Sequence, residues 1–184
     1  MSDEIMKYDV IIVGAGPSGL SAAINLKKLS INNNMDVSVC VVEKASEVGA
    51  HILSGAVLET KALDELIPDW KSKDTPIKTK VSTEKLLFLS ENKAYSIPKL
   101  FTPAVMHNEN NYIISLGRLC KWLSDQAESM GVEIYPGFTA SKILIDDSER
   151  VFGIKTGDHG ILKDGSKSEN YQSGIEIHSK YVFF

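Results

Sequence analysis

The sequence predicts an α/β fold with a parallel sheet, and three features support this prediction. An apolar run at Tyr8–Val13 leads into the glycine-rich stretch V-G-A-G-P-S-G-L at Val13–Leu20, and a second apolar run follows at Val37–Val42. Continuous apolar runs of this length are typical of parallel strands that are buried on both faces. A strand, a helix and a second strand joined by a right-handed crossover are the unit of a Rossmann-like domain.

The three glycines of the G-x-G-x-x-G pattern each have an expected role. Gly14 permits the tight turn after the first strand, Gly16 lets the backbone approach a pyrophosphate, and Gly19 lets the helix pack against the sheet. The N-terminus of that helix directs its N–H groups and its positive dipole end at the phosphates. Glu43 follows the second apolar run, where a carboxylate accepts hydrogen bonds from a ribose hydroxyl. The motif therefore predicts a dinucleotide site.

Two long helices are predicted from apolar residues that recur every three or four positions, in addition to a short helix that starts at Thr60 and is ended by Pro68. The first spans Ser18–Leu29 and ends in the polar loop Ser30–Asp36. The residues expected to face the sheet are Leu20, Ala23, Ile24 and Leu29. The second spans Leu116–Met130 and ends at Gly131, because glycine commonly terminates helices.

Later segments predict antiparallel strands. Val81–Ile97 alternates enough to form two strands joined at Glu91–Lys93, and Ile143–Ile145 and Val151–Lys155 flank a polar turn. The segments expected to be loops are Trp70–Pro76 and Gly157–Gly174. The apolar residues at the end of the chain, Ile175–Phe184, are expected to form a buried strand.

Three regions follow from this order of elements. Residues 1–80 hold the N-terminal βαβ region and the cofactor loop, residues 81–112 form a β-rich insertion, and residues 113–184 return to the dinucleotide-binding domain. A buried strand at Tyr181–Phe184 is expected to lead into another glycine-bearing loop over the cofactor. We therefore expect this domain to be incomplete at its C-terminus.

The composition excludes several classes of protein. The chain has 184 residues, of which 43% are hydrophobic and 24% are charged, and its formal net charge of −4 argues against nucleic acid as the main partner. Cys40 and Cys120 lie in apolar segments and are expected to be buried free thiols, which cannot ligate a metal by themselves. No apolar stretch is long enough to span a membrane, and the N-terminus carries no leader, so we expect a protein that is neither exported nor integral.

The identity of the dinucleotide is narrowed by two features. Glu43 disfavours NADP, whose 2′-phosphate would require arginine at this position. Hairpins and a long helix follow the βαβ unit, where a two-domain NAD dehydrogenase would continue with β-α repeats. This order favours a flavoprotein with antiparallel insertions.

Several longer motifs resemble those of one family, the electron transfer flavoprotein–ubiquinone oxidoreductases. The resemblance extends from Tyr8 to Phe184, almost the whole chain. The motifs that carry it are V-E-K-A-S-E-V-G-A-H-I-L-S-G-A (Val42–Ala56), I-P-D-W (Ile67–Trp70), N-Y-I-I-S-L-G (Asn111–Gly117), W-L-S-D-Q-A-E-S-M-G-V-E-I-Y-P-G-F (Trp122–Phe138) and T-G-D-H-G-I-L-K-D-G (Thr156–Gly165).

The resemblance implies an FAD enzyme that takes electrons from reduced electron transfer flavoprotein. Such an enzyme passes them through a [4Fe-4S] cluster and FAD to ubiquinone, on the cytoplasmic face of a bacterial inner membrane or the matrix face of the mitochondrial one. The four cysteines that hold the cluster have no counterpart here, so the chain resembles the N-terminal FAD-binding part. A non-catalytic FAD-binding module that needs a second chain is the alternative. A prenyl-chain reductase would share the βαβ unit but would not explain Trp122–Phe138 or Thr156–Gly165.

The resemblance also implies roles for individual residues, none of them catalytic. Gly14, Gly16, Ser18 and Gly19 would bind the FAD pyrophosphate, and Glu43 the adenosine ribose. The other residues implied to lie near the cofactor are Lys44, Gly49, Ser54, Gly55, Arg118 and Ala140. A solvated lysine at Lys44, an ordinary turn at Gly49–Gly55 and a surface arginine at Arg118 are the simpler interpretations of these positions.

The apolar, proline-broken segment Ile97–Val105 has two interpretations. It could cap the core as a loop. In the family, an apolar surface of this kind enters one leaflet of the membrane near the quinone, and Leu100 and Phe101 are the candidates for this contact.

Overall fold

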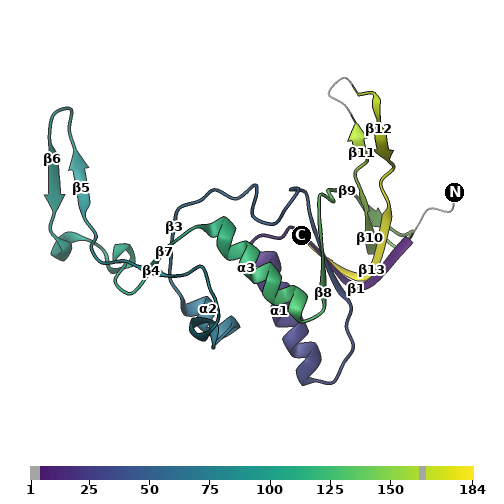
Figure 1. Cartoon of the computed structure of the whole chain (residues 1–184), viewed down its shortest axis with the longest axis horizontal. Coiled ribbons are helices and arrows are strands. Elements are labelled where there is room, and N and C mark those ends of the chain that lie inside the picture. Colours follow the sequence, from purple (N-terminus) through teal and green to yellow (C-terminus); the bar gives the residue numbers. More distant parts are fainter. Residues whose placement is uncertain (1–4, 162–164) are drawn as a thin grey trace. The chain divides into compact units, whose positions relative to one another are not determined.

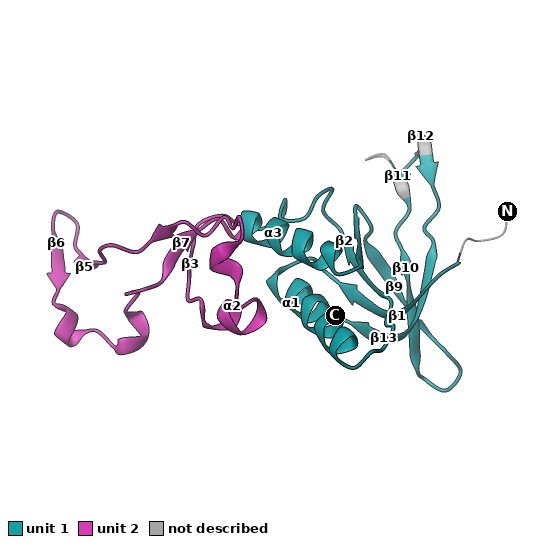
Figure 2. Ribbon diagram, turned by 60° about the horizontal axis from the view of Figure 1, so that its bottom comes forward, with its two compact units in different colours: residues 1–52, 117–184 teal, residues 53–116 magenta. Residues whose placement is uncertain are grey.

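The computed structural model of the chain describes residues 5–161 and 165–184. The chain forms two compact units (Figure 2): unit 1 comprises residues 1–52 and 117–184, and unit 2 comprises residues 53–116. Residues 53–80, which the sequence analysis grouped with the N-terminal βαβ region, therefore belong to the same compact unit as the β-rich insertion.

Unit 1 is built on a six-stranded sheet in the order β8-β2-β1-β13-β10-β9 (Figure 1). The strands are β1 (Ile5–Val13), β2 (Val39–Glu43), β8 (Val132–Pro136), β9 (Ala140–Ile145), β10 (Val151–Thr156) and β13 (Glu176–Phe183). The first strand pairs in parallel with β2 and with β13, and β2 pairs in parallel with β8. At the other edge of the sheet, β10 pairs antiparallel with β13, and β9 pairs antiparallel with β10. The predicted Rossmann-like α/β fold with antiparallel additions is confirmed.

Both faces of the parallel strands are covered. Helix α1 (Pro17–Asn32) packs on one face, where a Cβ atom placed on Gly19 would lie 3.2 Å from Cγ2 of Ile12. On the opposite face, side chains of β1 and β2 form a buried cluster with those of β10 and β13. Its members are Ile11, Cys40, Val42, Ile154 and Ile177. Coverage on both faces explains why the strand sequences are continuously apolar and do not alternate.

Helix α1 is longer than predicted, and its inward face is partly different. Leu20, Ala23 and Ile24 are buried as expected, but Leu29 is 49% exposed and Ser30 is buried in its place. A helix turns by about 100° per residue, so Leu29 lies opposite Leu20 while Ser30 lies in line with Ala23. The Ser30 hydroxyl is satisfied because it donates to the Met35 carbonyl at 2.5 Å.

Helix α3 (Leu116–Ser129) follows the prediction closely. Leu119, Cys120, Leu123 and Ala127 are buried. Its last turn is followed by Gly131, which has φ +82° and whose N–H donates to the Glu128 carbonyl at 2.9 Å. No helix among the described residues is long and apolar enough to cross a membrane.

The prediction that Gly157–Gly174 forms a loop is wrong for the residues of this segment that the structure describes. Strand β11 (His159–Ile161) pairs antiparallel with β12 (Lys167–Gln172), and residues 162–164 lie outside the described part. The polar sequence K-S-E-N-Y-Q gives no apolar alternation by which to recognise a strand. The carboxylate of Asp158 closes the base of this hairpin, because it accepts from Tyr171 Oη at 2.9 Å and from the Gly174 N–H at 2.8 Å.

The C-terminal strand is confirmed, but its burial is not. Strand β13 lies inside the sheet between β1 and β10. Ile177 is fully buried, whereas Tyr181, Phe183 and Phe184 are 64%, 46% and 70% exposed. The apolar run therefore marked the strand correctly but not the environment of its last side chains.

Unit 2 contains a three-stranded antiparallel sheet and a separate hairpin. The sheet has the order β3 (Ala56–Leu58), β7 (Tyr112–Ile114), β4 (Thr79–Lys80), and the hairpin joins β5 (Leu86–Leu89) to β6 (Ala94–Ile97). The hairpin is as predicted, but residues 81–85 are not in a strand. Two 3₁₀ turns, Lys99–Phe101 and Ala104–Met106, follow it.

The segment Trp70–Pro76 is not a plain loop. A 3₁₀ turn at Trp70–Ser72 follows the short helix α2 (Lys61–Leu66), and Trp70 is only 1% exposed. Its indole Nε1 donates to Oδ1 of Asp64 at 2.7 Å, and its ring meets that of Tyr112 edge-on at 5.8 Å. Trp70 therefore anchors the core of unit 2, where its N–H has a partner.

Candidate dinucleotide-binding site

The glycine loop turns tightly out of β1. Gly14 has φ +103° and its N–H donates to the Val42 carbonyl at 2.7 Å, which brings the loop to the carboxyl end of β2. A Cβ atom on Gly19 would lie 2.1 Å from the Gly14 carbonyl oxygen, a distance no side chain tolerates. Gly19 is therefore required for the close approach of α1 to the loop, as the motif predicts.

Gly16 forms the N-cap of α1 and faces open space. Its carbonyl accepts the helical bond from the Leu20 N–H at 3.0 Å, it supplies no capping side chain, and the first turn holds no acidic residue. The N–H groups of Ser18 and Gly19 thus precede the first helical bond, at the positive end of the helix dipole. A Cβ atom on Gly16 would meet no atom within 4 Å. This open space in front of free N–H groups fits a phosphate-bearing cofactor.

Glu43 contacts the glycine loop directly. One carboxylate oxygen, Oε2, accepts from the Ala15 N–H at 2.8 Å, and the other, Oε1, accepts from the Ala45 N–H at 2.9 Å. The sequence analysis predicted only a ribose acceptor at this position. Each oxygen of an ionised carboxylate has two acceptor sites, so Glu43 holds the loop and keeps capacity for ribose hydroxyls.

Gly49 packs against the start of α3. A Cβ atom on Gly49 would lie 2.5 Å from the carbonyl oxygen of Gly117, and Gly49 has φ +92°. The loop after β2 therefore approaches the helix backbone to backbone, beside Arg118. Arg118 and Lys44 are both exposed. The sequence analysis missed the partner Gly117, although a glycine at the second position of a helix was a visible signal.

Ser54 and Gly55 belong to unit 2, where they precede β3, and Gly55 has φ +88°. Ala140 opens β9 and packs against the buried cluster of unit 1. Ala140 comes four residues after Pro136, which pairs with Glu43 where β8 lies beside β2. An extended chain of four residues spans at most about 14 Å, so Ala140 lies within that distance of the carboxyl end of β8.

Cys120 lies near Glu43 and is a buried thiol. Its side chain is fully buried in α3, and burial together with the negative charge of Glu43 raises the pKa of the thiol to about 11. Burial likewise raises the pKa of Cys40 to about 12. Both cysteines therefore stay protonated as thiols at neutral pH, which fits the predicted buried free thiols. Among the described residues, no three His, Cys, Asp or Glu side chains gather to hold a metal ion.

Comparison with known proteins identifies the family. The chain is 57% identical over 97% of its length to the mitochondrial electron transfer flavoprotein–ubiquinone oxidoreductase of Dictyostelium discoideum. It is 54% identical over its whole length to the electron transfer flavoprotein–ubiquinone oxidoreductase of the bacterium Pseudomonas aeruginosa. The chain belongs to the electron transfer flavoprotein–ubiquinone oxidoreductase family. It spans 29% and 34% of the length of these two relatives, about a third of each. The Thi4 family model also matches residues 1–65, the part with the glycine loop and Glu43.

Solved structures share the fold of this oxidoreductase family member at low sequence identity. A geranylgeranyl bacteriochlorophyll reductase-like protein from Thermoplasma acidophilum matches with a TM-score of 0.66 and 20% identity, over 97% of this chain and 39% of its own. Aklavinone-11 hydroxylase in complex with FAD and aklavinone matches with a TM-score of 0.59 and 19% identity, over 99% of this chain and 33% of its own. These two likenesses are under 25% identical and show a shared fold alone, whereas the family is identified by the relatives that are more than 50% identical to the chain.

Proposed function

We propose that this chain binds FAD and forms the FAD-binding part of an electron transfer flavoprotein–ubiquinone oxidoreductase. The observation that carries the proposal is the glycine loop at the N-terminus of α1, held by Glu43 and open in front of Gly16, in a chain that belongs to this family. FAD, when bound, supplies the redox chemistry, and the protein supplies binding, orientation and electrostatics.

Each residue of the site would act on a different part of the cofactor. The N–H groups of Ser18 and Gly19 would bind the pyrophosphate, while Gly14 and Gly16 leave it room. Glu43 would accept from the adenosine ribose. Gly49, Ser54, Gly55, Lys44, Arg118 and Ala140 are proposed to complete the contacts, Arg118 through its guanidinium and Ala140 through its backbone.

The wider reaction would take electrons from reduced electron transfer flavoprotein and deliver them to ubiquinone through FAD and a [4Fe-4S] cluster. The names of the relatives support both partners. This chain has two cysteines, which are buried and on separate elements, so it offers no four-cysteine set for the cluster. The cluster would be held by another part of the full-length enzyme.

A membrane contact through Ile97–Val105 is part of the same proposal. Leu100, Phe101 and Val105 are 88%, 75% and 92% exposed. Exposed apolar side chains of this size, grouped in one segment, are typical of surfaces that enter a membrane interface. The enzyme would then lie on the inner face of a bacterial inner membrane or on the matrix face of the mitochondrial one.

The test is a flavin titration followed by a turnover assay. The purified chain is mixed with FAD, and we expect quenching of flavin fluorescence that saturates at one FAD per chain. The full-length protein from its native source is then assayed with reduced electron transfer flavoprotein and a short-chain ubiquinone. Saturable flavin binding without quinone reduction by the full-length protein would reduce the proposal to an FAD-binding module, and failure to bind FAD would reject it.

A further inference from the structure

Unit 2 contains a cavity of about 380 Å³ beside the β5–β6 hairpin. Its lining comes from residues 84–86, 96–99, 102 and 106–108, all within unit 2. The apolar lining residues are Leu86, Ile97, Pro98 and Met106. The exposed side chains of Leu100, Phe101 and Val105 lie within a few residues of the cavity wall in sequence.

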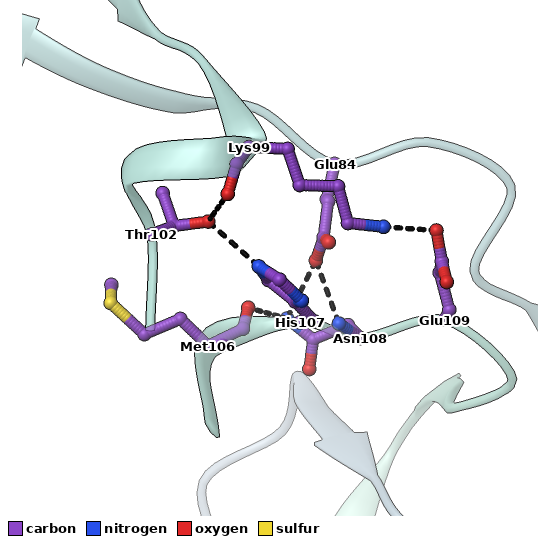
Figure 3. A network of polar contacts seen from close by, with 7 residues as sticks. All are labelled: Glu84, Lys99, Thr102, Met106, His107, Asn108 and Glu109. Atoms are coloured by element: carbon purple, nitrogen blue, oxygen red, sulfur yellow. Dashed lines mark hydrogen bonds and ion pairs between the residues drawn. The ribbon is translucent and has the colours of Figure 1, made fainter. Parts of the chain in front are cut away.

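The polar groups along one wall of the cavity form hydrogen bonds and an ion pair with other residues of unit 2 (Figure 3). The Thr102 hydroxyl donates to the Lys99 carbonyl at 2.8 Å, so in its 2.7 Å contact with His107 it accepts from Nε2–H of the imidazole. The Lys99 ammonium pairs with the carboxylate of Glu109. These contacts link the two 3₁₀ turns and engage the Lys99 ammonium and the Thr102 hydroxyl within the protein.

The other wall of the cavity has two hydrogen-bond donors that a ligand could use, Lys85 and Ser96. Oε2 of Glu84 accepts from the backbone N–H and from Nδ2 of Asn108, at 2.8 and 3.2 Å. Lys85 is exposed and takes part in none of the ion pairs formed by the described residues. Ser96 pairs with Leu87 across the hairpin, next to β5, and its hydroxyl has no hydrogen-bond partner among those same residues. A lysine and a serine among the lining residues of a partly apolar cavity suit a ligand that is anionic at one end and apolar at the other.

We propose that this cavity binds the phosphate group of a membrane phospholipid, with Lys85 and Ser96 as its ligands. The inference rests on the proposed membrane contact and adds a specific headgroup site to it. A lipid fits better than free phosphate because the cavity lining includes apolar residues and the neighbouring side chains Leu100, Phe101 and Val105 are exposed. A charge pair between an exposed lysine and a phosphate group is worth up to about 1 kcal/mol, as for other surface ion pairs, which corresponds to about five-fold in binding.

The experiment compares two vesicles. The intact chain is sedimented with vesicles of phosphatidylcholine and with vesicles of digalactosyldiacylglycerol, which form a bilayer without phosphate. We expect about five-fold stronger binding to phosphatidylcholine. Lys85→Ala should remove this preference and leave binding to the glycolipid unchanged. Lys93→Ala is the matched control, since Lys93 lies in the turn of the same hairpin and outside the cavity lining.

The outcomes separate the two proposals. Equal binding to both vesicles by the wild-type chain, or an equal loss of preference in Lys85→Ala and Lys93→Ala, overturns the headgroup site and leaves the membrane contact standing. Absence of binding to either vesicle rejects the membrane contact and the headgroup site with it. Loss of the preference in Lys85→Ala alone supports the site.

Discussion

Glu43 and Gly16 show how single residues shape the candidate site. Glu43 holds the glycine loop through the N–H groups of Ala15 and Ala45 and would also bind the ribose. Gly16 does the opposite, because it leaves space where a side chain would stand. One residue therefore positions the loop and the other keeps its front open.

Gly16→Val should abolish FAD binding while the chain stays folded. The valine side chain would extend into the open space and occupy the position of the pyrophosphate, where a Cβ atom meets no protein atom within 4 Å. FAD titration measures the first effect and thermal unfolding of the apoprotein the second. Gly19→Ala is the contrasting variant: its Cβ atom would lie 2.1 Å from the Gly14 carbonyl, so it should lower the Tm. Unchanged flavin binding in Gly16→Val would show that the cofactor lies elsewhere.

Glu43→Ala should weaken FAD binding by about 1.5–3 kcal/mol, the range for hydrogen bonds to a charged group, which is roughly a ten- to hundred-fold rise in Kd. Glu43→Gln should lose less, because the amide keeps one acceptor oxygen but cannot accept from both N–H groups. Fluorescence titration gives the three dissociation constants. Glu128→Ala, an exposed position on α3, serves as the control. Equal affinities in wild type and Glu43→Ala would remove Glu43 from the site.

At the scale of elements, a polar cluster joins β1 to its two neighbouring strands away from the glycine loop. The Asp9 carboxylate pairs with the Lys180 ammonium of β13 at 2.6 Å and accepts from the backbone N–H and the hydroxyl of Ser38, which precedes β2, both at 2.9 Å. These hydrogen bonds, that of Lys180 first, lower the pKa of Asp9 to about 2. The cluster therefore favours the ionised carboxylate in the folded state.

This cluster predicts a loss of stability in acid. A depressed folded-state pKa means that the contribution of Asp9 is fully present above its unfolded value of 3.8 and disappears as the pH falls through about 2. Asp9→Asn should therefore be less stable than wild type at pH 5 to 7, and the difference should shrink between pH 4 and pH 2. Thermal unfolding across this range tests it, with Asp125→Asn on α3 as the control. A difference that is constant with pH would contradict the assignment.

At the scale of the whole molecule, the glycine-loop part of the candidate cofactor site and the exposed apolar segment belong to different compact units. The glycine loop, Glu43 and Gly49 belong to unit 1, whereas Ile97–Val105 belongs to unit 2. Substitutions at the glycine loop and in Ile97–Val105 therefore change residues of different units.

Leu100→Asp combined with Phe101→Asp should abolish vesicle binding and leave FAD affinity unchanged. Burial of a leucine or phenylalanine side chain is worth about 1.5–3 kcal/mol, and both side chains are largely exposed in the chain. Sedimentation with phosphatidylcholine vesicles and FAD titration give the two readouts. The Tm should stay close to that of wild type, because exposed side chains contribute little to the core. Full vesicle binding by the double variant would reject the membrane role of this segment.

The sequence by itself determined the βαβ unit, the role of Gly19 and the hairpin of β5 and β6. Each depends on local periodicity or on a backbone requirement that one residue type meets. It also predicted the family through its longer motifs, and relatives that are more than 50% identical to the chain confirm that prediction. The direct contacts of Glu43 could not be read from it, since the Ala15 N–H reaches that carboxylate only when β1 and β2 pair.

Only the tertiary structure decided which side chains are buried and which backbones meet. Leu29 was expected inside and is exposed, because the helix rotates it away from the sheet, and Trp70 was expected in a loop and is buried against Tyr112. The approach of Gly49 to Gly117 joins positions far apart in the chain. Such contacts depend on the path of the backbone between them, and no local pattern of residues records that path.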